Sequence, residues 1–460
     1  MQGSHVWRGD AAVFDDGNLV SHAGLVPLLE LAEQAGLSRL LDDHVRFADE
    51  RVRSGAAHPT PKLTSIIAGM AAGADSIDDL DVVRSGGMKK LFTGVYASAT
   101  LGILLREFTH GHVRQLTAVL RRFLVGLAAR TPVLDGIADR AYVDIDSLLR
   151  PVYGHAKQGA SYGHTKIENK VILRRGLSPL AVTLSTDTAA PVIAGVRLRA
   201  GRAGSSRGAT GMIVEAINTA IEAGARAHNV LVRGDSAYCS AKVIHAVVKA
   251  GAMFSFAIAR NPSVSAAINS IPADAWTPVQ YPGAVTDPDT GELISDAYVS
   301  EVEYTAFADE PHKITGRLIV RRILDANTQD PLFPVWRYHP FFTNSTQPVT
   351  DADVTHRAHA VIETVWSDLI DGPWAHQPSG RFAANAAWTA LAAITHNLLR
   401  AAGTLTTARY ATARGATLRS HLVNITARLA RPQRRPVLHL PAHWPRAHAW
   451  LTLWQAVFRT

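Results

Sequence analysis

Four acidic residues occupy positions from which carboxylates could carry out chemistry. Asp144 and Asp146 alternate with apolar residues in the run Ala141–Ser147, which predicts a β-strand with both carboxylates on one face. Asp235 ends a second short apolar run, and Glu363 lies among Val, Ile and Trp in a helical stretch. A carboxylate in such surroundings is costly unless a cation or a substrate group pairs with it.

Carboxylate oxygens of this kind are the ligands that Mg²⁺ and Mn²⁺ prefer in proteins. Two such ions together can promote phosphoryl transfer, since one activates the attacking oxygen and the other stabilises the leaving oxygen. The sequence therefore indicates a two-ion Mg²⁺ or Mn²⁺ site. Taken alone, each acid is better explained as part of a helix cap, a turn or a salt bridge, and only the four together indicate such a site.

Positive charge is concentrated at the C-terminal end. The 460 residues carry a net charge of +8, and the segment from Gly372 to Thr460 contains eleven Arg but no Lys, Asp or Glu. A block of like charge at one end is typical of proteins that bind a polyanion. Compositional drift at a tolerant C-terminus is the alternative.

Composition also bounds the cellular compartment. The single cysteine, Cys239, excludes an intramolecular disulfide and a cysteine-based zinc site. The segment Met1–Asp10 lacks a signal-peptide pattern, and the apolar stretch Phe382–Leu405 is interrupted by Asn, His and Arg. We therefore expect a soluble cytoplasmic protein with no membrane partner.

The periodicity of apolar residues predicts an α/β fold with five regions. Residues 1–135 are expected to be all-helical and DNA-binding, with Thr109–Arg130 as the clearest helix. Residues 136–261 alternate strands and helices and form the first part of a mixed-sheet core, and 346–405 complete that core with the helix that bears Glu363. The β-rich segment 262–345 is an insertion between them, and 406–460 form a basic, DNA-contacting tail.

Several short motifs follow one another along the chain in a characteristic order. They are Val143-Asp-Ile-Asp-Ser147, Tyr153-Gly-His155, Arg233-Gly-Asp-Ser236, the helix around Glu363, Phe382-Ala-Ala-Asn385 and Asn397-Leu398. With the β-rich insertion between Asp235 and Glu363, they resemble the DDE transposases of bacterial insertion sequences. The insertion-sequence family numbered thirteen-eighty, within the larger group named after insertion sequence four, is the most similar. This resemblance implies a ribonuclease-H-like catalytic core flanked by helices.

The resemblance also assigns the acids. Asp235 corresponds to the second catalytic residue and Glu363 to the third, all of them metal ligands in the family. The family's Asp-x-Thr pattern places the first on Asp146, although Leu148 replaces the hydroxyl residue. Asp144 lies on the same face of the predicted strand as Asp146, so both remain candidates for the first position.

The family's helix also tends to carry Tyr, Arg and Lys at seven before, four before and seven after the Glu, on one face suited to holding a DNA phosphate. In this sequence these positions are His356, His359 and Ile370, and Arg357 could take over the phosphate contact. We predict DNA contacts at His356, His359 and Arg357, and in the tail at Arg431, Arg434 and Arg435. A zinc site at the two histidines is an alternative for which no third ligand is evident.

The implied function is cut-and-paste DNA transposition. The protein would bind the terminal inverted repeats of its own element, cleave the strands in a metal-dependent reaction and join them to double-stranded target DNA, as a homodimer in the synaptic complex. Two alternatives remain open, a decayed transposase that only binds DNA and a nuclease without strand transfer. The Gly-rich segment Gly201–Gly211 lacks the Gly-Lys-Ser/Thr ending of a phosphate-binding loop, and no Gly-x-Ser-x-Gly turn supports a serine hydrolase.

Overall fold

The fold was obtained as a computed structural model, which describes residues 11–48, 55–154, 156–167, 170–280, 289, 291, 297–308, 313–324 and 335–459. Met1–Asp10, for which the sequence predicts no signal peptide, lie outside these described residues. His155 of the motif Tyr153-Gly-His155 lies outside them as well. Within them, no helix combines the length and the apolar character that crossing a membrane requires.

The N-terminal region is helical, as its periodicity predicts, and the longest of its helices buries the stripe of Leu, Val and Phe side chains expected from the sequence. One short strand, β1 (Leu19–Val20), is added to it and pairs with a strand from the far end of the chain. The helices are α1 (Leu25–Gln34), α2 (Leu37–His44), α3 (Pro59–Ala72), α4 (Met88–Leu91), α5 (Ser98–Glu107) and α6 (His110–Ala128), with a 3₁₀ segment at Asp78–Arg84.

The central sheet confirms the predicted ribonuclease-H-like architecture. Its core strands lie in the order β7-β6-β2-β8-β9, with β2, β8 and β9 parallel and β6 antiparallel to both of its neighbours. Helix α7 (Ala209–Glu222) packs on β2, β6 and β7, and α8 (Ala241–Lys249) packs on β9. The strands are β2 (Ala141–Ser147), β6 (Leu180–Ser185), β7 (Val192–Arg197), β8 (Val230–Gly234) and β9 (Met253–Ala257).

The β-rich insertion extends this same sheet. Strand β13 pairs antiparallel with β9, and β12, β11 and β10 follow it outward, so nine strands share one hydrogen-bonded sheet. Helix α9 (Pro262–Asn269) packs against β11. The strands of the insertion are β10 (Thr277–Pro278), β11 (Ala297–Ala306), β12 (Ile314–Leu324) and β13 (Trp336–Thr343).

A separate three-stranded sheet, in the order β3-β5-β4, follows β2. The apolar pattern of Lys170–Leu173 predicts part of β5, but nothing predicts its partner β4, because the residues of β4 mix Gly, His and Lys and do not alternate apolar with polar. Its strands are β3 (Arg150–Pro151), β4 (Ser161–Ile167) and β5 (Lys170–Leu177).

The helical stretch around Glu363 is divided. Helix α10 (Val349–Arg357) passes through a 3₁₀ turn at Ala358–Val361 into α11 (Ile362–Ile370), and α12 (Phe382–Thr404) follows. Helix α12 is buried along almost its whole length, in agreement with its interpretation as a core helix and not a membrane span.

The basic tail is folded onto the N-terminal region. Strand β14 pairs with both β1 and β15, and α15 packs against α1. These elements are α13 (Ala408–Ala411), α14 (Gly415–Leu418), a π-helical turn at Arg419–Val423, β14 (Ala427–Ala430), β15 (Val437–His439) and α15 (Ala447–Phe458). The first and last parts of the chain therefore form one structural unit.

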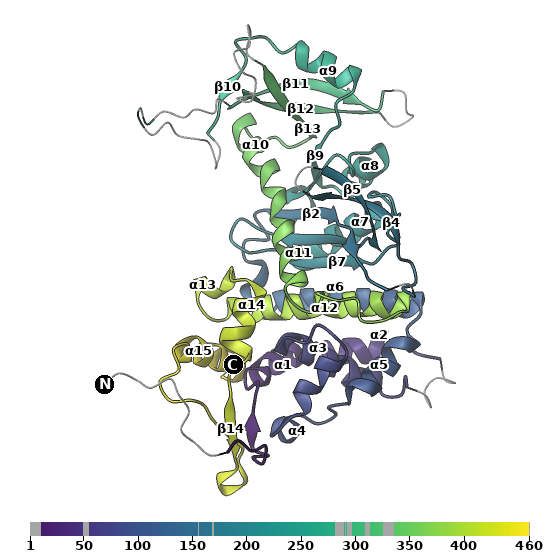
Figure 1. The fold of residues 1–460 in the computed structure, drawn as a ribbon. Coiled ribbons are helices and arrows are strands. Elements are labelled where there is room, and N and C mark those ends of the chain that lie inside the picture. The colour runs from purple at the N-terminus through teal and green to yellow at the C-terminus, as the bar shows by residue number, and fades with distance from the viewer. Residues whose placement is uncertain are drawn as a thin grey trace.

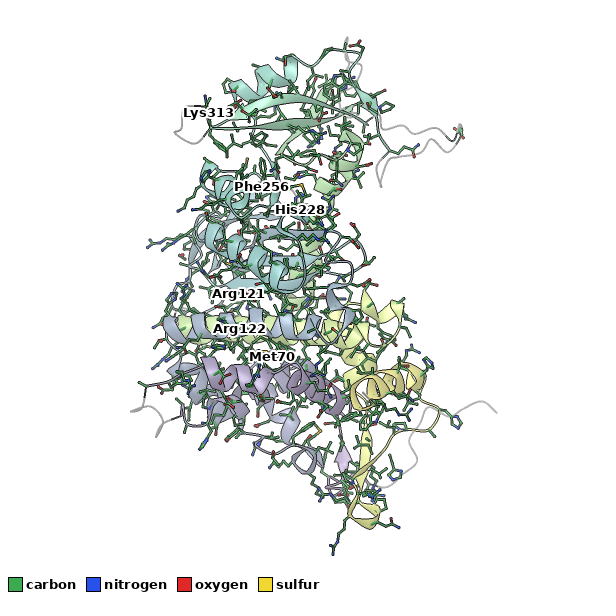
Figure 2. The ribbon with its side chains drawn as sticks, turned by 180° about the vertical axis from the view of Figure 1, so that it is seen from behind. Met70, Arg121, Arg122, His228, Phe256 and Lys313 are labelled. Carbon is green, nitrogen blue, oxygen red and sulfur yellow. The ribbon has the colours of Figure 1, made fainter. Side chains whose placement is uncertain are left out.

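The layers succeed one another along the molecule. Helices α6 and α12 lie side by side across its middle, with the sheet on one side and the other N-terminal helices on the other (Figure 1). Seen from behind, the same succession runs from Met70 in α3 through Arg122 in α6 and Phe256 in β9 to Lys313 beside β12 (Figure 2). The insertion and the β14–β15 hairpin thus lie at opposite ends (Figure 1).

The edge strand β7 is joined to α12 by one side chain. The Asn397 Oδ1 atom accepts a hydrogen bond from the backbone N–H of Ile193 at 2.8 Å, and the Asn397 amide donates to the carbonyl of the same residue at 2.8 Å. Asn397 is fully buried. It satisfies the two backbone groups that an edge strand would otherwise leave unpaired.

We expect Asn397→Ala to lower the free energy of unfolding by about 2–4 kcal/mol, because it leaves a buried N–H and a buried carbonyl without partners. Urea denaturation followed by circular dichroism measures this change. Asn269→Ala, at an exposed position at the end of α9, is the matched control and should change stability little. Equal unfolding midpoints for the two variants would contradict the assigned role of Asn397.

Candidate active site

The second acid of β2 and the acid after β8 lie next to each other at one edge of the sheet. Ile145 of β2 pairs with Gly234 of β8 in parallel register, so Asp146 and Asp235 are the next residues along two neighbouring strands. Their backbones lie about one strand spacing apart, roughly 4.8 Å. Because β2 and β8 are parallel, their carboxyl ends place both acids at the same edge, as expected from the sequence.

Asp146 is held in a defined orientation. Its Oδ1 atom accepts the backbone N–H of Ser147 at 2.6 Å, and its Oδ2 atom accepts the indole N–H of Trp366 at 3.1 Å. Burial raises the pKa of Asp146 to about 6; the hydrogen bond from Ser147 opposes this shift, and the nearby charges of Asp235 and Glu363 add to it. Asp235 and Glu363 therefore both lie within electrostatic reach of Asp146.

Glu363 lies in the first turn of α11, where its side chain is exposed. The expectation that it is surrounded by apolar neighbours is wrong, because Ile362, Val365 and Trp366 point to the buried face of the helix and Glu363 to the other. Because the carboxylate of Glu363 is exposed to solvent, it does not need a partner of opposite charge inside the protein. Its carboxylate is open to a cation or to a substrate.

Helix α11 is fixed by a buried acid. Asp368 is buried and forms ion pairs with Arg400 of α12, at 3.2 Å, and with Arg414. Arg414 also donates to the Ser367 hydroxyl at 2.6 Å. These contacts determine where α11 places Glu363, and they use two arginines of the acid-free C-terminal segment for structure.

Asp144 has a different environment. It is 1% exposed, and both of its oxygens accept hydrogen bonds from the guanidinium of Arg233, at 2.7 and 2.8 Å. Arg233 is 2% exposed, donates to the Thr355 carbonyl at 2.8 Å and lies over the Tyr142 ring at 4.0 Å. A carboxylate engaged in this way is a poor metal ligand, so the geometry argues against Asp144 and favours Asp146 as the first acid.

The family model described as Transposase DDE domain group 1 matches residues 10–460. The chain belongs to the DDE transposase family. Members of this family cut DNA, transfer strands and thereby move mobile elements, and they generally use divalent metal ions. No curated protein matches the chain.

The carboxylates of the transposase suit a hard cation such as Mg²⁺. Among the residues that the structure describes, no three acidic, histidine or cysteine side chains stand close enough together to hold one ion. Mg²⁺ does not require such a cage, because it usually keeps several waters and is bound through one or two carboxylates and the phosphates of the substrate. Asp146 and Asp235, with Glu363 in electrostatic reach, fit that type of site.

The helix positions predicted to contact DNA are arranged differently from the expectation. His356 is buried, its Nδ1 atom lies 2.9 Å from the Ser255 hydroxyl and its ring stacks on Phe341. Burial lowers the pKa of His356 well below its usual value, and the charge of His359 contributes. A mostly buried imidazole that is held by Ser255 and stacked on Phe341 is a poor phosphate ligand, so the geometry argues against the predicted DNA contact at His356.

The 3₁₀ turn at Ala358–Val361 also changes the shared helical face on which that prediction depended. It separates His356 from Glu363, and Ile370 ends α11. His359 is partly exposed, with its Nδ1 atom 2.5 Å from the His356 carbonyl, so it is not arranged as half of a zinc pair. Arg357 is partly exposed and pairs with Asp353 at 2.9 Å.

A basic cavity of about 330 Å³ adjoins Asp235 on the side of the insertion. Ser236, the next residue along the chain, forms part of its wall. Basic side chains from β12, β13, the segment after β9 and the helices before Glu363 line it together with Asp353; they are Arg260, Arg321, His339, Arg357 and His359. Arg357 and His359 thus keep a place beside the acids of the transposase.

The predicted DNA contacts of the tail lie elsewhere. Arg431, Arg434 and Arg435 are exposed in the turn between β14 and β15. That hairpin projects from the end of the molecule opposite to the insertion (Figure 1). Arg431 donates to the Lys90 carbonyl at 3.3 Å, and the three residues remain predicted contacts.

Two residues of the site received no role from the sequence. Trp366 orients Asp146, and Arg233 neutralises Asp144. A signal for Arg233 was present, because an arginine inside an apolar strand requires a counter-ion and the acids of β2 are the available ones. Trp366 gave no comparable signal, since an indole on an apolar helix face is usually only a packing residue.

We expect Mn²⁺ binding to weaken as the pH falls through about 6, because the raised pKa of Asp146 means that a proton must leave before the ion can bind. Below that pH the apparent affinity should fall about tenfold per pH unit. Isothermal titration between pH 5 and 8 measures it. Asp146→Asn should bind weakly at every pH; an unchanged pH profile in that variant would exclude Asp146 as the titrating group.

We expect Arg233→Met to destabilise the transposase by about 3–5 kcal/mol, because Asp144 becomes an unpaired buried charge. The double variant Asp144→Leu with Arg233→Met removes both charges and should recover most of this loss. Urea denaturation of both variants, with the exposed Arg226→Met as control, tests the pairing. A double variant no more stable than the single one would show that the two residues do not act as a pair.

Proposed function

We propose that this protein is the transposase of an insertion sequence in family thirteen-eighty of the group named after insertion sequence four. It binds the terminal inverted repeats of its element in the bacterial cytoplasm, cleaves the strands and joins the freed 3′-hydroxyls to target DNA. The observation that carries the proposal is the placement of Asp146 and Asp235 side by side at the carboxyl edge of a ribonuclease-H-like sheet, with Glu363 near enough to raise the pKa of Asp146.

In this proposal, Asp146, Asp235 and Glu363 hold two Mg²⁺ or Mn²⁺ ions. Bound there, the ions would supply Lewis-acid activation of the attacking oxygen and stabilisation of the leaving oxygen in an in-line displacement. The chain itself provides the geometry. Trp366 and the Ser147 N–H fix the carboxylate of Asp146, and the ion pairs of Asp368 fix the helix that presents Glu363. These constraints preorganise the three carboxylates before DNA binds.

The basic groups around the acids would hold the DNA. Arg357 and His359 line the cavity beside Ser236, so they can meet a phosphate next to the scissile bond. The exposed arginines of the β14–β15 turn would contact DNA farther from the cleavage point. Such contacts provide affinity that decreases with salt and carry little sequence information. The N-terminal helices would read the end sequence, and synapsis of two ends would require a homodimer.

A protein that binds DNA without cutting it is the second candidate. It is favoured by the burial of His356 and by Ile370 at a position where the family tends to carry Lys. Both departures would remove phosphate contacts from the helical segment that carries Glu363 and would leave the three acids in place. The two candidates therefore differ in one observable property, the metal-dependent cleavage of strands at the element ends. A nuclease without strand transfer would cut these ends but leave them unjoined to a target duplex.

We expect the purified protein to cut a labelled duplex carrying the DNA that flanks its own gene when Mn²⁺ or Mg²⁺ is present. Asp235→Asn should reduce the cleavage rate at least 100-fold, about the effect of removing one essential group, without loss of duplex binding. The control is Glu222→Gln, because Glu222 is an exposed acid at the C-terminal end of α7, and this variant should cut normally. Normal cleavage by Asp235→Asn would reject the site, and tight binding without cleavage by the unaltered protein would favour the second candidate.

A further inference from the structure

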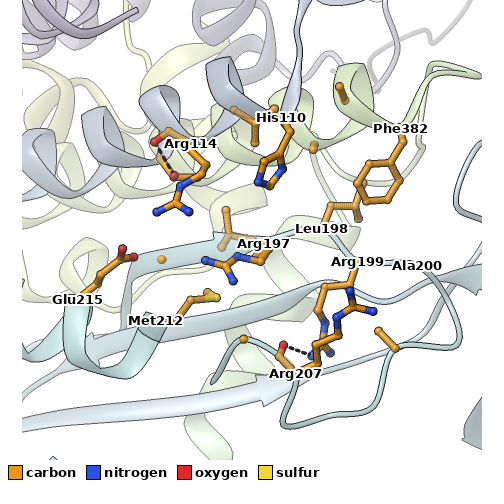
Figure 3. A pocket seen from close by; sticks show the side chains of 18 of the residues that line it. His110, Arg114, Arg197, Leu198, Arg199, Ala200, Arg207, Met212, Glu215 and Phe382 are labelled. Atoms are coloured by element: carbon orange, nitrogen blue, oxygen red, sulfur yellow. Dashed lines mark hydrogen bonds between the residues drawn. The ribbon is translucent and has the colours of Figure 1, made fainter. Parts of the chain in front are cut away.

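A second basic cavity lies on the other side of the acids. It has a volume of about 440 Å³ and is enclosed by α6, β7, the start of α12 and the glycine-rich turn before α7. In Figure 3, His110 and Arg114 reach from α6 toward Arg197 on β7. The arginines that line it are Arg114, Arg121, Arg197, Arg199 and Arg207, and His110 lies beside them.

Two of these arginines are engaged by the protein. Arg121 pairs at 2.9 Å with Glu215, the acid in the wall of the cavity. Arg199 is buried and holds the glycine-rich turn by donating to the Gly204, Ser205 and Arg207 carbonyls at 2.7–3.2 Å. Their charges are used to build the cavity.

The other three arginines are available. In the part of the chain that the structure describes, Arg114, Arg197 and Arg207 have no carboxylate partner. The side chains of Arg114 and Arg207 are exposed, and that of Arg197 is partly exposed. Three uncompensated guanidinium groups around one hollow repel one another, and this cost is relieved when an anion binds between them.

Gly208 lets one of them approach the start of α7. Gly208 has a φ of +87°, and a Cβ atom at this position would lie only 2.7 Å from the Arg197 Nη1 atom. A glycine therefore allows the guanidinium to lie against the turn that leads into the helix. The free N–H groups at a helix start favour an anion in the same place, in support of the arginines.

The cavity opens near the edge that carries the acids. Ser147, Leu180 and Arg197 form one row across β2, β6 and β7, so Arg197 lies two strand spacings from the residue after Asp146. Two spacings are about 10 Å. The charge of Asp146 also acts on Arg199, whose pKa is lowered by burial and by the charges of Arg197 and Arg207.

We propose that Arg114, Arg197 and Arg207 form a binding site for the DNA sugar-phosphate backbone, on the opposite side of the acids from the cavity beside Ser236. The proposal rests on the proposed function, because it takes DNA as the substrate at that edge. The cavity can take one phosphate with its sugar but not a turn of duplex. With about 3.4 Å of axial rise per nucleotide, the phosphate bound there lies roughly two to five nucleotides from the scissile one.

The test compares two double variants that each lose two positive charges. Arg114→Ala with Arg207→Ala removes two exposed arginines of the cavity. Arg122→Ala with Arg226→Ala removes two exposed arginines outside it, and Arg122 lies on the same helix as Arg114 (Figure 2). Duplex affinity is measured over a range of KCl concentrations without divalent ions. The slope of log affinity against log salt should fall by about 0.9 in the cavity variant, because the cavity takes one phosphate and each phosphate contact contributes about 0.9. Equal slopes in the two variants would overturn the proposal.

Position is tested with duplexes that carry one neutral methylphosphonate linkage at successive places. A linkage roughly two to five nucleotides from the cleavage point should weaken binding by the unaltered protein about tenfold and have little effect on the cavity variant, because a charged Arg–phosphate contact contributes about 1.4 kcal/mol or more. Arg197→Gln should reproduce this loss. An unaltered protein that binds but does not cut would reject the proposed catalysis alone, since the salt slopes still test the cavity.

Inorganic phosphate distinguishes a site for small anions from a site for DNA. Competition by millimolar phosphate at constant ionic strength should affect the unaltered protein and not the cavity variant. Phosphate binding that depends on the cavity, together with an unchanged DNA salt slope in the cavity variant, would show that the site takes a free anion and would overturn the proposal.

Discussion

The buried ion pair between Asp144 and Arg233 connects the parts that the candidate site requires. It joins β2 to β8 through two hydrogen bonds, and the same guanidinium reaches the Thr355 carbonyl of α10. Asp146 lies two residues after Asp144 in β2, and Asp235 lies two residues after Arg233, directly after the end of β8. Helix α10 leads into the segment that presents Glu363. A buried pair of this kind contributes little net stability compared with apolar residues, but its geometry tolerates few alternatives. It sets the register of the strands and the start of the helical segment at the same time.

A second set of contacts completes this framework from the other side. Asp368 ties α11 to Arg400 of α12 and to Arg414, while Asn397 of α12 holds the edge strand β7. Helix α12 therefore positions the Glu-bearing helix and the far edge of the sheet together. Because Arg400 and Arg414 form structural ion pairs, the arginine-rich segment from Gly372 to Thr460 is not simply an exposed tail. Part of its charge neutralises Asp368, Arg419 is buried against the Asp371 carbonyl, and the arginines of the β14–β15 turn remain on the surface.

The sequence predicted most of the elements but not the contacts that select among residues of one type. The alternation around Asp144 and Asp146 identified β2 and its shared face, yet only the register with Arg233 shows which carboxylate is engaged, and register is not encoded in local spacing. The exposure of Glu363 could have been predicted, since Ile362, Val365 and Trp366 already define a buried stripe that excludes it. The pairing of β1 with β14 could not, because two very short strands from opposite ends of the chain carry no local signal.

The continuity of the sheet fixes a length within the molecule. One row of paired residues runs from Gly234 through Phe256, Phe342 and Leu318 to Val302, across β8, β9, β13, β12 and β11. Its four steps amount to about 19 Å at the spacing of hydrogen-bonded strands. A domain joined by loops could tilt or slide, whereas this ladder permits only twisting and bending of the sheet as a whole. A molecule bound to the outer strands is therefore held at a fixed distance from the edge of the sheet that carries Asp146 and Asp235.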